Sequence, residues 1–394
     1  MCNYRFENNP VAVENAICGN EEIQSGEPCA ALHTHISVGD NSKESVSFYL
    51  GAEEGALKHI DEVEKRIKDN LKELRNQSNT DMQEGKLDEW WNEFLDKFEC
   101  RIPDEAAQRQ INIWGAIDSV HTARYSRSVN TNAPGTRTLG FRDTCQDMLA
   151  ITYRKPEIAK ARLKYLMSKQ YKEGNAIHCE GFYNNDLPDY VTRCDDHLWL
   201  AFLVYSLIAE TGDIGLLDEQ IPYLASDHIS KSESATVWKH LMAGVSFTES
   251  HLGEHRLPLT LRGDWNDIIG KFSREGKGES VFAAQQYVVV LNYMIEIAEL
   301  VNNEKDAKYL NDCKKRQIEN IEKYSWNGSW WYRCFNDDGK PLGCKTDEFG
   351  KIWINSQTWS VISGTGTKKQ RRQAMDAVNK YLDTGIGLKN SRYA

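Results

Sequence analysis

Two acidic residues flank a tryptophan in the segment Gly263-Asp264-Trp265-Asn266-Asp267, and these residue types suit the chemistry of a sugar. The indole offers a flat apolar face to a pyranose ring. A carboxylate can hold sugar hydroxyls, and a carboxylic acid can protonate a glycosidic oxygen. Asp and Asn also favour turns and helix caps, so the motif taken alone is equally consistent with a capped turn before a helix.

A second polar cluster, Arg137-Thr-Leu-Gly-Phe-Arg142-Asp143-Thr-Cys-Gln-Asp147, precedes this motif in the chain. Arginine suits phosphate because its planar fork binds two oxygens at once. Further segments of this polar and aromatic character are Arg124-Tyr-Ser-Arg127-Ser, Asp195-Asp-His-Leu-Trp-Leu200, Gly276-Lys-Gly-Glu-Ser280 and Asn355-Ser-Gln-Thr-Trp359. Several such segments in one order are more specific than any single motif.

In that order, the segments resemble glycoside hydrolase family 94, the inverting disaccharide phosphorylases, which include the cellobiose and chitobiose phosphorylases. The resemblance runs from about Asp104 to the C-terminus. It implies that inorganic phosphate, as a co-substrate, cleaves a β-linked gluco-disaccharide or oligosaccharide to give an α-sugar 1-phosphate. It implies no cofactor. No metal site is expected from the spacing of the ten histidines.

The resemblance also assigns roles to five residues. Asp267 is the general acid, Arg127 binds phosphate, and the donor sugar is bound by Arg137, Asp143 and Trp265. Phosphate is already an anion, so the second carboxylate with which an ordinary inverting glycosidase activates water can be absent. A competing interpretation of Arg137 and Asp143 is a buried ion pair that organises their loop.

Neighbouring residues favour structural roles. Asp264 is expected to hold the loop or to raise the pKa of Asp267 by like-charge proximity. Arg142 and Asp147 are predicted to support the site, whereas Cys145 is predicted to be a reduced, structural thiol.

Three other features are less specific. The run Asp195-Asp-His197 favours helix capping over catalysis. Gly276 and Gly278 are only a weak indication of a phosphate-binding loop. Trp330 and Trp331 suit a sugar platform and core packing equally well.

Hydrophobic periodicity divides the chain into three parts. Residues 1–55 contain two alternating stretches, 31–38 and 44–50, and are predicted to be the C-terminal part of a β-sandwich-like domain. Residues 56–100 are predicted to be a charged helical linker. Residues 101–394 are rich in helix signals, which predict a mainly α fold; the family resemblance names it an (α/α)6 toroid.

Individual helices have clear signals. Pro156 opens one amphipathic helix, and Gly212 ends another that runs from about Leu198 to Ala209 and is apolar nearly all round. A third apolar helix is predicted from Val281 to Val301. The segment 329–340 is predicted to form a short hairpin.

The resemblance predicts that this chain lacks both the first and the last part of a complete family member. The start of the β-domain and the C-terminal part of the barrel are expected to be missing, because family members are about twice as long as these 394 residues. The remaining phosphate and acceptor residues are then expected beyond residue 394, and the chain alone is expected to bind sugar but to catalyse poorly.

Charge and hydropathy indicate which classes of binding partner this chain can have. The formal net charge of −10 argues against nucleic acid, because no basic face is available for phosphates. The N-terminus has no apolar signal core, and no uninterrupted apolar run predicts a membrane span, so a cytosolic protein is expected. Its partners are expected to be a small sugar and phosphate, with a homodimer left open. An inverting glycoside hydrolase and an inactive sugar-binding fragment are the alternative functions.

Overall fold

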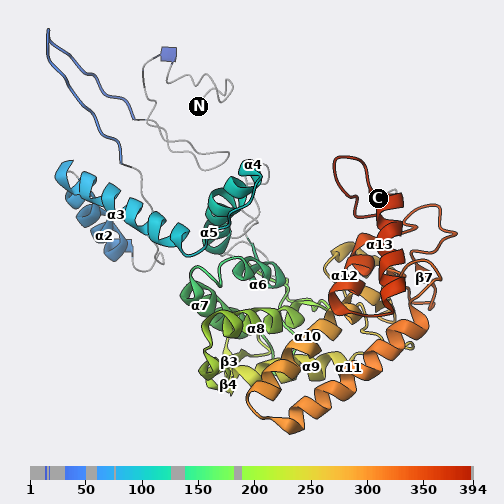
Figure 1. Ribbon diagram of the computed structural model, residues 1–394. Helices are drawn as coiled ribbons and strands as arrows, with labels where there is room; N and C mark the ends of the chain where they lie inside the picture. Colours follow the sequence, from blue (N-terminus) through green and yellow to red (C-terminus); the bar gives the residue numbers. More distant parts are fainter. Residues whose placement is uncertain are drawn as a thin grey trace. The chain divides into compact units, whose positions relative to one another are not determined.

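The computed structural model describes residues 14–15, 17, 32–49, 60–74, 77–125, 138–181 and 189–391. The chain divides into two compact units, Met1–Asp88 and Glu89–Ala394 (Figure 1). The described part of the second unit is mainly helical, as the sequence predicts.

The first unit differs from its sequence prediction in the region expected to be β. Residues 32–49 form no strand; they contain a turn in which the Ser42 amide donates to the Gly39 carbonyl over 3.2 Å. Two strands that lack a partner sheet are only marginally stable, and no partner strand is described for these residues. The predicted linker is helical: α2 spans Ile60–Leu74, and α3 spans Gln77–Asp96 and continues into the second unit.

Helices dominate the second unit. The α-helices are α4 (Glu105–Arg109), α5 (Gly115–Tyr125), α6 (Phe141–Leu149), α7 (Pro156–Met167), α8 (Trp199–Thr211), α9 (Val237–Ser250), α10 (Val281–Leu300), α11 (Glu304–Tyr324), α12 (Ile354–Ser363) and α13 (Lys368–Leu382). Shorter turns of helix are η2 (Gln110–Trp114), η3 (Asp196–Leu198), η4 (Ile214–Asp218) and η5 (Asp267–Phe272).

Short antiparallel strands tie the loops between these helices together. They are β1 (Thr138–Gly140) with β2 (Cys179–Gly181), β3 (Gln220–Leu224) with β4 (Lys231–Thr236), and the three-stranded set β5 (Glu279–Ser280), β6 (Cys334–Phe335) and β7 (Pro341–Leu342). The predicted hairpin is the β6–β7 pair. Its partner β5 leads directly into α10, so the hairpin is held beside the start of that helix.

Local signals set the predicted helix ends. Pro156 is the first residue of α7, and Gly212 ends α8 in the left-handed conformation, with φ of 68°. Ser280 caps α10 by accepting a hydrogen bond from the Ala283 amide. A capping side chain satisfies a backbone N–H that has no partner within the helix, so these ends follow from nearby residues alone.

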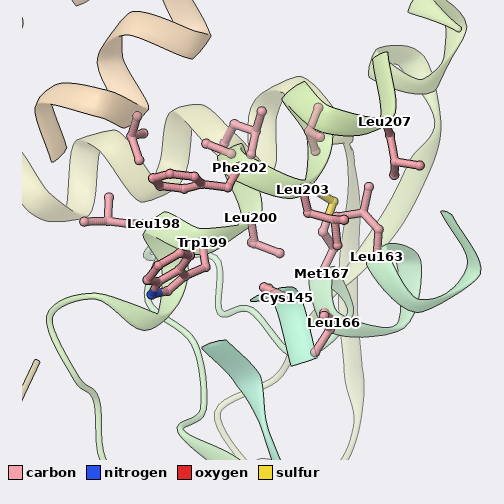
Figure 2. Close-up of a cluster of buried hydrophobic side chains, with 14 of the residues drawn as sticks. Cys145, Leu163, Leu166, Met167, Leu198, Trp199, Leu200, Phe202, Leu203 and Leu207 are labelled. Atoms are coloured by element: carbon pink, nitrogen blue, oxygen red, sulfur yellow. The ribbon is translucent and has the colours of Figure 1, made fainter. Parts of the chain in front are cut away.

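The core of the second unit lies where α8 meets α6, α7 and α10. Figure 2 shows the contacts of α8, whose Leu200 and Leu203 pack near Leu163 and Met167 of α7. By length and composition α10 could cross a membrane, but 83% of its apolar window is buried inside the protein. A core helix has the same composition, and burial of most of α8 and α10 accounts for their largely apolar character.

Candidate active site

Asp264 is completely buried and has a partner on every side. Arg333 donates to both carboxylate oxygens, over 2.5 and 2.7 Å, and the Ser280 hydroxyl donates to Oδ2 over 2.6 Å. The Asn266 amide donates to Oδ1 over 2.9 Å. Asp264 therefore holds the loop to β5 and β6, which confirms one of its two predicted roles.

Gly263 and Asn266 shape the turn that presents Asp267. Gly263 has φ of 152°, and a Cβ there would lie 3.1 Å from the Cα of Asp267 and 3.2 Å from Cδ of Arg193. Only glycine accommodates that conformation and that close approach. The Asn266 side chain caps η5 by accepting from the Ile268 amide, so Asp267 is the first residue of this short helix.

Three cationic or protonatable groups converge on one oxygen of Asp267. Its Oδ1 accepts from Nη2 of Arg142 over 3.1 Å and from Nε of Arg193 over 3.3 Å, and Nε2 of His178 lies 3.7 Å away. Half of the Asp267 side chain, 52%, is exposed. Asp267 is thus an accessible carboxylate with one anchored oxygen.

These neighbours determine the charge of the group. Burial raises the pKa of Asp267, but Arg142, His178 and Arg193 together outweigh burial and hold the pKa below its ordinary value. Asp264 is not a cause of this shift, so the expectation that it raises the pKa of Asp267 is wrong. The carboxylate of Asp264 is already neutralised by Arg333, which removes its repulsion.

His178 is itself held by a buried acid. Its Nδ1 lies 3.1 Å from Oδ2 of Asp196, whose side chain is completely buried. Burial lowers the pKa of the imidazole, but the hydrogen bond and the charge of Asp196 outweigh burial and raise this pKa above its ordinary value. The arrangement favours the imidazolium form of His178.

The structure contradicts helix capping by the Asp195–His197 run. Asp195 occupies the cap position of η3, yet its side chain makes no capping hydrogen bond. It instead lies 3.4 Å from Nη1 of Arg142 and accepts from the Trp199 indole. His197 contacts the Thr248 hydroxyl over 2.8 Å. A buried polar or charged group needs a partner more than a helix end needs a cap, so these side chains turn inward.

Helix α6 joins this centre to the tryptophan of the motif. Arg142 is buried and its Nη1 donates to the Asp264 carbonyl over 2.9 Å. Asp143 follows it, with Oδ1 4.0 Å from Nε of Arg142 and a third of its side chain exposed. One turn later, Gln146 accepts from the Trp265 indole over 3.3 Å, and Trp265 is 39% exposed. Asp143, Trp265 and Asp267 are thus brought together.

Two of the predicted site residues lie outside the described residues. These are Arg127, predicted to bind phosphate, and Arg137, predicted to bind the sugar. Their roles stay predictions. Arg137 precedes β1, and that strand leads into α6.

The glycine-containing loop before β5 already holds an acidic group. Asp337 accepts from the amides of Glu275, Lys277 and Gly278 over 2.9 to 3.1 Å. Backbone N–H groups arranged in this way can bind a phosphate, but here a carboxylate of the same chain takes that place. This loop is therefore not available as the phosphate cradle that its glycines weakly suggest.

Two further expectations are decided by burial. Trp330 and Trp331 are almost fully buried and belong to two different core clusters, so they pack in the core and form no sugar platform. Cys145 is fully buried in the cluster drawn in Figure 2, where burial raises the pKa of the thiol. All the cysteines in the described ranges are free thiols, as the sequence predicts for them.

Sequence reasoning did not single out His178, Arg193 or Arg333 as functional. Pairing of β1 with β2 brings His178 beside α6, where its carbonyl accepts from the Phe141 amide. Arg193 reaches Asp267 because it pairs with Leu261, just before the motif. Only Arg193 has a local signal, since it stands next to the acidic pair Asp195-Asp196.

Among the described residues, no group of three or more His, Cys, Asp or Glu side chains is arranged to hold a metal ion. The centre around Asp267 is instead built from one exposed carboxylate and the cations that face it. Such a centre can give or take a proton beside an aromatic surface, which is the chemistry of glycosidic bond cleavage.

Comparison with known proteins agrees with this chemistry. N,N'-diacetylchitobiose phosphorylase of Vibrio furnissii is 28% identical over 98% of this chain and 49% of its own length. Solabiose phosphorylase of Paenibacillus borealis is 35% identical over 63% of this chain and 31% of its own length. From the same organism, 3-O-beta-D-glucopyranosyl-beta-D-glucuronide phosphorylase is 26% identical over 96% of this chain. The chain spans about half the length of the curated relatives it matches along most of its own length.

A solved structure also shares the fold. A GH78 family rhamnosidase of a Bacillus species superposes with a TM-score of 0.50 at 13% identity, over 71% of this chain and 26% of that chain. Family models give the more specific result. The supersandwich domain of glycosyl hydrolase 94 matches residues 2–72, and the catalytic domain of the glycosyl hydrolase 94 superfamily matches residues 90–392. Because the second match alone covers most of the sequence, the chain belongs to glycosyl hydrolase family 94.

Proposed function

We propose that this chain is part of an inverting glycoside phosphorylase, which transfers the glycosyl group of a β-linked gluco-disaccharide or oligosaccharide to phosphate. The observation that carries the proposal is the half-exposed Asp267 carboxylate beside Trp265, in a family whose named relatives include several phosphorylases. Asp267 is the acid that protonates the leaving oxygen. Phosphate attacks the anomeric carbon from the opposite face and leaves an α-sugar 1-phosphate.

The charge around Asp267 fits a reaction that runs in both directions. Its pKa lies below the ordinary value in the unliganded site, so the carboxylate is ready to act as a base in synthesis. Phosphorolysis needs the protonated acid. Phosphate bound nearby would add negative charge, which favours the protonated acid. Binding of phosphate therefore favours the protonated form of Asp267, which is the form that phosphorolysis requires.

We further propose the fold around the site, the co-substrate and the donor sugar. The helices of the second unit are taken to be part of an (α/α)6 toroid, and inorganic phosphate is the only co-substrate, with no cofactor. A cytosolic location fits the free thiols of the described cysteines. The donor is a glucose-type sugar held by Asp143, Trp265 and Arg137.

The direct test is phosphate dependence. Purified protein is incubated with chitobiose, cellobiose and laminaribiose, with and without phosphate, and in reverse with glucose or N-acetylglucosamine 1-phosphate and monosaccharide acceptors. Release of an α-sugar 1-phosphate, or synthesis of a disaccharide, supports the proposal. Sugar release that does not depend on phosphate would identify a hydrolase. Sugar binding detected by saturation-transfer NMR, without turnover in either direction, would identify a sugar-binding fragment.

Two arginine substitutions assign the ligand sites. Arg127→Lys should raise the apparent KM for phosphate, because lysine cannot form the bidentate fork. Arg137→Lys should weaken sugar binding and leave the KM for phosphate nearly unchanged. Equal effects of both substitutions on both substrates would make the two arginines structural.

A further inference from the structure

The two oxygens of the Asp267 carboxylate have different surroundings. Oδ1 faces Arg142, Arg193 and His178 at 3.1, 3.3 and 3.7 Å. Oδ2 has no hydrogen bond or ion pair with any residue in the described ranges. A proton placed on Oδ1 would displace three cationic contacts, whereas a proton on Oδ2 displaces none of them.

Other contacts fix both arginines in place. Arg142 is buried and also contacts the Asp264 carbonyl and Asp195. Arg193 donates to Oδ2 of Asp189 over 2.9 Å and to the Val191 carbonyl over 3.1 Å. Because Nη1 of Arg142 and both Nη atoms of Arg193 are held by these other partners, neither guanidinium is free to follow Asp267 if the carboxylate turns. The anchored oxygen is therefore held by rigid donors.

His178 completes the set and is the member that can change charge. Its imidazole links the buried Asp196 to Oδ1 of Asp267 through its two ring nitrogens. The charged groups that face it are Asp196 of η3, Asp267 of η5, Arg142 of α6 and Arg193. Asp196 favours the imidazolium, and the two arginines oppose it. The carboxylate of Asp267, 3.7 Å from Nε2, is a second negative charge on the imidazole.

We propose that His178, oriented by Asp196, is a positioning residue that anchors Oδ1 of Asp267 together with Arg142 and Arg193, so that Oδ2 alone exchanges the proton with the sugar. In phosphorolysis the Oδ2–H bond breaks as the leaving oxygen gains that proton and the electron pair of its bond to the anomeric carbon. In synthesis Oδ2 takes the proton back from the acceptor hydroxyl. The inference rests on the proposed role of Asp267.

The first test needs no catalysis. Histidine side chains of the intact chain are followed by NMR during a pH titration, and the His178 signal is assigned by its loss in His178→Asn. Replacing Asp267 by Asn should lower the pKa of His178, because a facing negative charge is removed; Asp196→Asn should lower it further. Asp338→Asn, on an exposed turn, is the control and should leave it unchanged. If the pKa of His178 were the same in Asp267→Asn as in the unmodified protein, the proposal would be wrong, whatever the activity of the protein.

The second test is kinetic and uses the protein in whichever direction it turns over. His178→Asn, which is too short to reach Asp267, should lower kcat by about 10- to 100-fold, the scale of a small misplacement of a catalytic group. KM for sugar and phosphate should change little. Loss of the facing cation should also raise the pKa of Asp267, so the decline of phosphorolysis at high pH should move to higher pH.

Two comparisons separate positioning from a general structural effect. His178→Gln, whose amide nitrogen reaches about as far as Nε2, should restore part of kcat but not the original pH limit. His121→Asn, on the exposed face of α5, should match the unmodified protein. Reduced kcat in His178→Asn with an unmoved pH limit and no rescue by Gln would mean that His178 only supports the fold. Absence of turnover in every form of the protein that contains this chain would count against the proposed function, while the NMR titration would still decide the inference.

Discussion

The two aspartates of the Gly263–Asp267 segment occupy opposite environments. Asp264 has no exposed surface, and both its oxygens accept hydrogen bonds from Arg333. Oδ1 also accepts from the Asn266 amide, and Oδ2 from the Ser280 hydroxyl. Asp267 is half exposed, and only one of its oxygens is engaged by described residues. A carboxylate whose lone pairs are all occupied can hold a fold together but cannot exchange a proton. The same residue type becomes available for chemistry when one oxygen is left open.

The largest effect should come from the open carboxylate. In an active, completed form of the protein, Asp267→Asn should lower turnover by about 10²–10⁴-fold, the usual contribution of a general acid, with little change in sugar binding. The amide keeps the shape of the side chain and an oxygen for the two arginines. Initial rates of sugar 1-phosphate formation measure turnover, and saturation-transfer NMR measures binding. If an Asp264→Asn protein that is still folded lost more turnover than Asp267→Asn, the assignment of the acid would be wrong.

Asp264→Asn should chiefly reduce stability. It leaves the guanidinium of Arg333, which is completely buried, without its counter-ion, and breaking a buried pair costs about 3–5 kcal/mol. Urea denaturation followed by circular dichroism measures the free energy of unfolding. The control is Glu275→Gln, which breaks an exposed pair with Lys277 and should leave the free energy of unfolding nearly unchanged. Similar losses in both variants would remove the distinction between the two environments.

The carboxylate of Asp337 has an environment between those of Asp264 and Asp267. Asp337 is partly buried and accepts three backbone N–H bonds, so Asp337→Asn should cost about 1–2 kcal/mol of stability. The neighbouring Asp338→Asn is the matched control, because Asp338 is exposed and its nearest cation, Lys340, lies 3.8 Å away. Hydrogen exchange should show faster opening of residues 275–278 only in the Asp337 variant.

The Asp337 contribution should depend on pH. Burial raises the pKa of Asp337, but the N–H donors outweigh burial and hold the pKa below its ordinary value. A group with a lowered folded-state pKa stabilises the protein above its unfolded pKa, about 3.9 for Asp, and loses this effect as pH falls through the folded pKa. The difference in stability between the unmodified protein and Asp337→Asn should therefore shrink below about pH 4. A difference that is constant from pH 7 to pH 3 would contradict this account.

The smallest effect should come from Trp265→Phe. Phenylalanine keeps an aromatic face for the sugar but loses the hydrogen bond from the indole to Gln146, which is worth about 0.5–1.5 kcal/mol. Sugar affinity, measured by calorimetry, should fall by only a few-fold. Trp265→Ala removes the face itself and should cost more. Equal losses in the two variants would show that the hydrogen bond, and not the aromatic surface, is what the sugar requires.

Many of the helices could be predicted from the sequence, because the residues that start and end them lie next to them in the chain. Pro156, Gly212 and the apolar run of α10 act through neighbouring residues, and their helices begin and end close to where the sequence predicts. The expected strands at 31–38 and 44–50 stay a prediction, in a region that the supersandwich family model matches over residues 2–72. A strand needs a partner, and none is paired with residues 32–49 in the described part of the chain.

The sequence by itself determined the helices of the second unit, the family resemblance and the residue types that carry the proposed chemistry. Only the tertiary structure decided which cations meet Asp267, because His178 and Arg193 reach it through pairing of segments distant in the chain. It also decided that Asp264 is structural, that Trp330 and Trp331 belong to the core, and that Asp337 occupies the glycine-containing loop. Burial and partners determine the role of a polar side chain, and both depend on contacts that no local pattern specifies.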